Sequence, residues 1–131
     1  MIEEVTNNGK ILAVIIYADH SENGIKFITP QDFSMQMAFM KHEQGHNITA
    51  HAHNMFKREI HGTQEVLIIR KGKVKVNFYD DSRKCVGNKI ISSGDVILLA
   101  SGGHGFEMLE DTEMIEIKQG PYCEGKDKEK F

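Results

Sequence analysis

Four residues of this 131-residue chain carry side chains that could bind a metal ion together. His51 and His53 form a His-x-His pair, and on a β-strand both imidazoles would point to the same face. Glu65 opens an apolar run, and His104 ends a glycine-rich stretch. Imidazole and carboxylate ligands that converge inside a small barrel suit a divalent transition metal with open positions. If the fold brings them together, His51, His53, Glu65 and His104 could hold one divalent metal (Zn, Mn, Fe or Ni).

Each of these residues also has an ordinary structural interpretation. In a chain with seven histidines, a His-x-His pair can simply be two surface side chains. Glu65 could be a solvent-facing strand residue. His61 lies between the pair and Glu65, where it is either a rival ligand or an exposed loop histidine.

The eleven residues 54–64 separate the His-x-His pair from Glu65 and could form a flap over the mouth of a barrel. Arg58 is a candidate for substrate binding, because its forked donors match carboxylate or phosphate. Glu59, His61 and Glu65 are candidates to move a proton in catalysis. The alternative is that Arg58 and Glu59 form a solvated surface pair that contributes little.

Short β-rich runs separated by glycines predict an all-β domain. In residues 73–79, three apolar side chains alternate with polar ones, as in a half-buried strand. Lys71–Gly72 is predicted to be a tight hairpin turn. Residues 31–39 are the nearest rival for a helix, and no stretch predicts a long one. The predicted strands are 11–17, 25–28, 34–40, 48–53, 65–70, 73–79, 89–91, 96–99, 105–109 and 113–118.

Composition predicts a single domain over residues 1–131 and excludes several protein classes. The net charge of −3 lacks the basic excess of a nucleic-acid binder. The longest apolar run, residues 11–17, is too short to cross a membrane, so no membrane association is expected. Cys85 and Cys123 are too few for a disulfide scaffold, which predicts free thiols and a cytoplasmic location.

The spacing of glycines and ligands resembles the cupin family. The first cupin motif corresponds to about residues 45–72 and the second to about residues 94–106. The connection after His53 is longer than is usual in that family, Ala100 stands where proline is usual, and the asparagine that often follows the second motif is absent. The residues at motif positions are Gly45, His51, His53, Glu65, Gly72, Gly94, Gly102 and His104.

The resemblance implies a double-stranded β-helix, or jelly-roll barrel, with one divalent metal inside that is held by His51, His53, Glu65 and His104. It further implies action on a small polar molecule, such as a sugar or sugar nucleotide, by an isomerase- or epimerase-like enzyme of a surface-carbohydrate pathway. A non-catalytic ligand-binding or regulatory cupin is one alternative, and an Fe(II)-dependent oxygenase is another.

A homodimer is expected, because the edge strands of such folds need cover and the apolar residues 11–17 could supply it. The charged segment 124–131 is expected to be frayed or docked on a partner.

Overall fold

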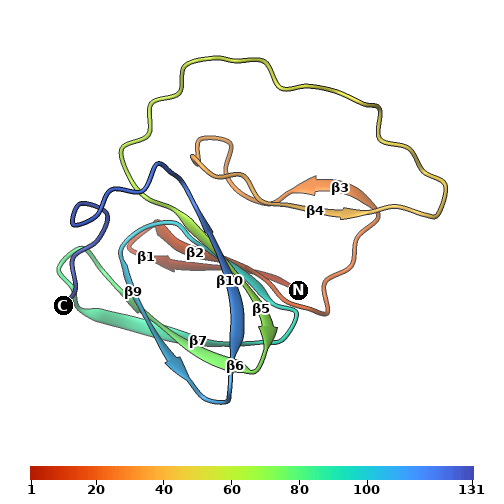
Figure 1. Ribbon diagram of the computed structural model, residues 1–131. Helices are drawn as coiled ribbons and strands as arrows, with labels where there is room; N and C mark the ends of the chain where they lie inside the picture. Colours follow the sequence, from red (N-terminus) through yellow and green to blue (C-terminus); the bar gives the residue numbers. More distant parts are fainter.

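The computed structural model describes all 131 residues and contains ten β-strands and no helix, which confirms the all-β prediction (Figure 1). It therefore has no helix long and apolar enough to cross a membrane. The strands are β1 (Ile2–Asn7), β2 (Lys10–Ile16), β3 (Gly24–Phe27), β4 (Ala38–Lys41), β5 (Glu65–Lys71), β6 (Lys73–Tyr79), β7 (Cys85–Ser92), β8 (Val96–Leu99), β9 (Gly103–Met108) and β10 (Glu113–Lys118).

The strands form three antiparallel sheets rather than one closed barrel. A five-stranded sheet has the order β1-β2-β8-β5-β10, and a three-stranded sheet has the order β7-β6-β9. Strands β3 and β4 pair only with each other. The closed barrel expected from the sequence is thus replaced by facing sheets that keep their edge strands.

The main core lies between the five-stranded and three-stranded sheets. The alternation predicted for β6 is confirmed, because Val74, Val76 and Phe78 are fully buried. They pack against side chains of the facing sheet, including Leu67 and Ile69 of β5. This core fixes the distance between the two sheets and so positions any site built across them.

A second apolar cluster covers the opposite face of the five-stranded sheet. Val14 of β2 and Leu98 of β8 pack there against Met37, which directly precedes β4. Strand β2 is therefore buried on both faces, which explains its continuous apolar sequence. Residues 11–17 were expected to supply an intermolecular edge, and this expectation is wrong because β2 lies between β1 and β8.

The predicted turn at Lys71–Gly72 is also corrected. Strands β5 and β6 do not pair, because the chain passes at Gly72 from one sheet to the other. Gly72 has φ 89°, and a Cβ there would lie 2.3 Å from the carbonyl oxygen of Asp111. The glycine therefore marks a crossing between sheets that a side chain would obstruct.

Three further local predictions differ from the structure. Residues 48–53 are not a strand but part of the long loop (residues 42–64), which extends away from the sheets (Figure 1). The strand predicted at residues 34–40 begins only at Ala38, where β4 starts, and no part of residues 31–39 is helical. Strand β1 was missed, although Asn8 and Gly9 both have positive φ, as a two-residue hairpin turn to β2 requires.

Candidate functional site

Glu65 is a carboxylate that the fold has placed at the edge of the core. In β5 it shares a face with Leu67 and Ile69, both core residues, and its relative exposure is only 9%. The other buried carboxylate, Asp95, accepts hydrogen bonds from the backbone nitrogens of Ala18 and Ser92. Asp95 therefore has a turn-forming role, which leaves Glu65 as the buried acid available for chemistry.

His104 reaches Glu65 from the facing sheet. It lies on β9, where it is paired with Phe78 of β6. Its Nε2 is 2.7 Å from Oε1 of Glu65, and its side chain keeps 30% exposure. Two of the predicted site residues, 39 positions apart in sequence, are thus brought into direct contact with solvent access on one side.

A second carboxylate joins this pair. Glu116 of β10 shares a hydrogen bond with Glu65, and this raises the pKa of Glu116. The pKa of Glu65 is lowered, because the hydrogen bond from His104 outweighs the effect of burial. The two carboxylates therefore differ in proton affinity, with Glu65 the one that stays ionised.

Lys118 extends the site toward the end of the sheet. It is the antiparallel partner of Glu65 in the β5–β10 ladder. Its Nζ lies 2.9 Å from Oδ2 of Asp127, and this hydrogen bond raises the pKa of Lys118. The ammonium group of Lys118 is therefore a cation next to the Glu65–His104 pair. It is already paired with a carboxylate of the C-terminal segment (residues 123–131).

The structure does not bring His51 and His53 to this site. Both are exposed on the long loop, with their ring centroids 5.3 Å apart. Nδ1 of His51 lies 2.9 Å from the carbonyl oxygen of Thr49, within the loop itself. Because this segment is not a strand, the expected alignment of the two imidazoles on one face of a sheet is absent.

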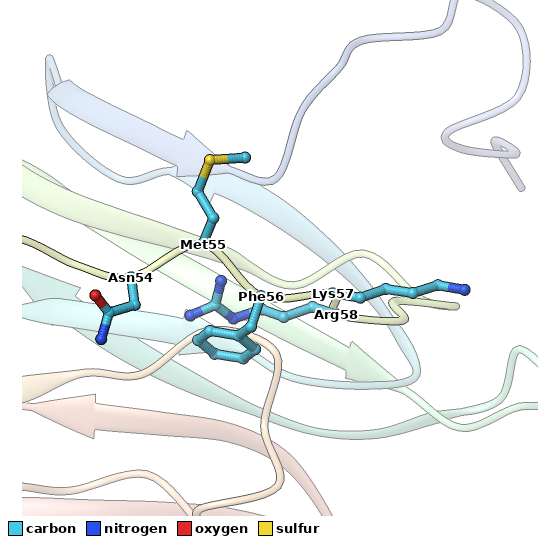
Figure 2. A pocket seen from close by; sticks show the side chains of 5 residues that line it. All are labelled: Asn54, Met55, Phe56, Lys57 and Arg58. Atoms are coloured by element: carbon cyan, nitrogen blue, oxygen red, sulfur yellow. The ribbon is translucent and has the colours of Figure 1, made fainter.

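The predicted substrate-binding and proton-transfer residues of the insert also lie on this loop. The guanidinium of Arg58 sits 3.7 Å from the centroid of the Phe56 ring. Figure 2 shows these two side chains together on one side of the backbone, with Met55 pointing to the other. Nε2 of His61 lies 3.8 Å from Oε2 of Glu59, and all of these residues are exposed. The open hollow at residues 54–58 is lined by loop residues alone.

The contact between Glu65 and His104 is suited to proton transfer, and it provides two of the four predicted metal ligands. An imidazole and a carboxylate in contact can hold or pass a proton. Both groups are also common metal ligands. No group of three or more His, Cys, Asp or Glu side chains is arranged to hold an ion, so the four predicted ligands do not fit one metal in this arrangement.

Sequence reasoning missed Glu116, Lys118 and Asp127. A signal for the first two was present, since the alternation of β10 places Met114, Glu116 and Lys118 on one face. Met114 packs against the core, so Glu116 and Lys118 lie on the same side of the sheet as Glu65, where Glu116 remains exposed. Nothing in the local sequence links Asp127 to this place.

Comparison with known proteins gives no further assignment: no family model, no curated protein and no solved structure matches the chain.

Proposed function

We propose that this chain is a small cupin that binds one divalent metal and acts on a small polar molecule, such as a sugar or sugar nucleotide. The observation that supports this proposal best is the 2.7 Å contact between Glu65 and His104. These residues occupy ligand positions in the first and second cupin motifs, and they meet between two facing antiparallel sheets. Paired sheets of this kind are the general architecture of jelly rolls.

The long loop is proposed to complete the metal site with His51 and His53. Hydrogen bonds within residues 42–62 join His46 to Glu43 and His51 to Thr49. Its apolar side chains, such as Met55 and Phe56, are exposed. A loop of this length without secondary structure is uncommon and is usually functional. Closure over the Glu65–His104 pair would cost few existing contacts and would add two imidazoles.

An isomerase or epimerase reaction needs a group that removes and returns a proton next to a carbonyl. Glu65, His104 and Glu116 form a chain of proton-exchanging groups at the site. When bound, a divalent metal supplies Lewis-acid polarisation of a carbonyl oxygen. Glu59 and His61 are proposed as further proton carriers that approach with the loop.

One observation favours a non-catalytic alternative. The Glu65–His104 pair is complete without any ligand and joins the two sheets, as a purely structural ion pair would. A binding or regulatory cupin would keep this pair and carry out no turnover. An Fe(II)-dependent oxygenase is the remaining alternative, which the identity of the metal would reveal.

A homodimer in the cytoplasm is part of the proposal. The outward face of edge strand β10 exposes Ile115 and Ile117, which a second copy would cover. Cys85 and Cys123 are both exposed and free, as a reducing compartment would keep them.

The experiment for the proposed function is a metal analysis of protein purified without a histidine tag. We expect close to one equivalent of a divalent transition metal in the parent protein. Glu65→Gln should lose most of it, whereas Glu4→Gln, an exposed acid outside the site, should retain it. Iron would favour the oxygenase, and no metal in the parent protein, even after incubation with Zn, Mn, Fe or Ni, would overturn the proposal.

A further inference from the structure

The C-terminal segment, which was expected to be frayed or docked on a partner, is docked on the body of the same chain. Asp127 accepts a hydrogen bond from Thr63 at 2.8 Å and pairs with Lys118 at 2.9 Å. Glu129 pairs with Arg83. The Phe131 ring packs edge-on against Tyr79, with their centroids 5.1 Å apart.

These contacts flank the Glu65–His104 pair on both sheets. Lys118 is the ladder partner of Glu65 on the five-stranded sheet. On the three-stranded sheet, Gly103 directly precedes His104, and a Cβ on Gly103 would lie 2.7 Å from Cζ of Phe131. The segment therefore crosses from one sheet to the other at the end where the pair lies, as its path from β10 to the C-terminus indicates (Figure 1).

In the ion pairs of this contact, the body of the chain supplies the cations and the C-terminal segment supplies the carboxylates. The groups on the body are the cations Lys118 and Arg83, and those on the segment are the carboxylates Asp127 and Glu129. All four side chains retain solvent exposure, between 22% and 73%. Ion pairs of this kind are individually weak and exchange readily with other anions.

We propose that residues 123–131 form a strap over the Glu65–His104 pair. The Asp127 carboxylate pairs with Lys118 at the position that the anionic group of a ligand would take. An incoming ligand with a phosphate or carboxylate would exchange with Asp127 and release the strap. This inference deepens the proposed function, since it assigns an anionic ligand to the same site. Access to His104 can nevertheless be tested without metal, ligand or turnover.

The first test labels histidines with diethyl pyrocarbonate in EDTA-treated protein and measures each site by peptide mass spectrometry. The double variant Asp127→Asn/Phe131→Ala removes both ends of the strap contact. We expect His104 to be labelled at least about fivefold faster in this variant, because losing contacts worth about 1 kcal/mol raises the population with a released segment by that factor. His46, exposed on the long loop, serves as the internal reference, and Glu124→Gln controls for loss of an acid in the same segment. Equal labelling of His104 in parent and double variant would overturn the strap.

The second test measures pyrophosphate binding by calorimetry at low salt. The double variant should bind pyrophosphate about fivefold tighter or more than the parent, because the competing carboxylate is gone. Adding Lys118→Met should remove this gain. Unchanged affinity on strap release, or a gain that survives Lys118→Met, would contradict the anion assignment. If His104 becomes accessible while the protein binds no metal, the strap stands and the metal proposal fails.

Discussion

At the scale of single residues, the molecule uses carboxylates to join its two sheets at separate places. Glu65 contacts His104 at one. At the second place, the carboxylate of Glu3 on β1 accepts a hydrogen bond of 2.7 Å from the Tyr17 hydroxyl and forms an ion pair with Lys89 of β7. The second network lies apart from the ligand positions, so its contribution to stability can be measured without disturbing the proposed site.

The Glu3 network predicts a specific acid dependence of stability. The hydrogen bond from Lys89 lowers the pKa of Glu3 from 4.5, and the Tyr17 hydroxyl adds to this. Ionised Glu3 therefore stabilises the fold above its unfolded pKa, and this stabilisation is lost as pH falls through the folded value. Glu3→Gln should lower Tm at pH 7, and the difference from the parent protein should disappear as the pH falls below 4.5 and the Glu3 carboxylate becomes protonated in the folded state.

The measurement is Tm by circular dichroism across that range, with Glu4→Gln as the matched control. A Tm difference between Glu3→Gln and the parent that stays constant throughout the acid range would show that the carboxylate charge has no role.

The same network predicts an alkaline effect on Tyr17. Burial and the Glu3 carboxylate raise the pKa of Tyr17 to about 12. Titration of tyrosine absorbance at 295 nm should therefore show one late phase, which moves to lower pH in Glu3→Gln. A midpoint unchanged by this substitution would refute the contact.

At the scale of elements, the crossing from β5 to β6 is the point at which the two sheets are connected. Gly72 has φ 89° and no room for a Cβ, whereas Gly45 has φ 88° and nothing within 4 Å of that position. Gly72→Ala should therefore cost about 2–3 kcal/mol, against about 1 kcal/mol for Gly45→Ala, where only backbone strain acts. Urea unfolding gives both values, and equal losses would mean that the close approach to Asp111 is not limiting.

The long loop should be dispensable for folding. None of residues 42–63 is buried, whereas the backbone N–H and side chain of Gln64 hydrogen-bond with Gln119 and with Ser34 and Met35. Deleting residues 55–61 should leave Tm within a few degrees of the parent. Gln64→Ala should lower Tm more, since it removes the acceptor of the hydrogen bonds from the Ser34 hydroxyl and the Met35 N–H. The deletion should also weaken metal binding. Failure of the shortened chain to fold would make the loop part of the core.

Strand positions were predictable from the sequence wherever one face is apolar. The alternation in residues 73–79 located β6 because its apolar half faces the core. The alternation in residues 113–118 also located β10, although there the apolar side chains of Ile115 and Ile117 are exposed and only Met114 packs on the core. The sheet to which each strand belongs was not predictable. Lys71–Gly72 has the sequence of a hairpin turn, and only the three-dimensional structure shows that β5 and β6 belong to different sheets.

Two of the four predicted metal ligands lie together in the structure, and the other two do not. Glu65 and His104 were singled out because they match cupin motif positions, one at the start of an apolar run and one after a glycine-rich turn, and the structure brings the two into contact. The loop conformation at His51 and His53 was not predictable, since alternating small residues fit a strand or an extended loop equally.

At the scale of the whole molecule, β10 leaves an apolar edge unprotected. Ile115 and Ile117 are exposed on its outer face, and β10 has only β5 as a neighbour. Ile115→Lys/Ile117→Lys should convert a dimer to a monomer, as measured by light scattering, because charges on an edge strand oppose pairing. Glu113→Lys is the matched control on the same face. A double variant with the mass of the parent assembly would place any interface elsewhere.

We propose that Glu65 and His104 lie at one metal site, and calorimetric titration of Zn²⁺ into His104→Ala measures the contribution of His104 to that site. His104 is brought to Glu65 only by the packing of the two sheets. Removing it should weaken metal binding by at least about 10- to 100-fold, the loss known even for residues that only support a ligand. It should also abolish the metal-dependent rise in Tm. His46→Ala, which removes an exposed imidazole outside the site, should retain both. If His104→Ala binds Zn²⁺ with the affinity of the parent protein, Glu65 and His104 are a structural ion pair and the metal site is not there.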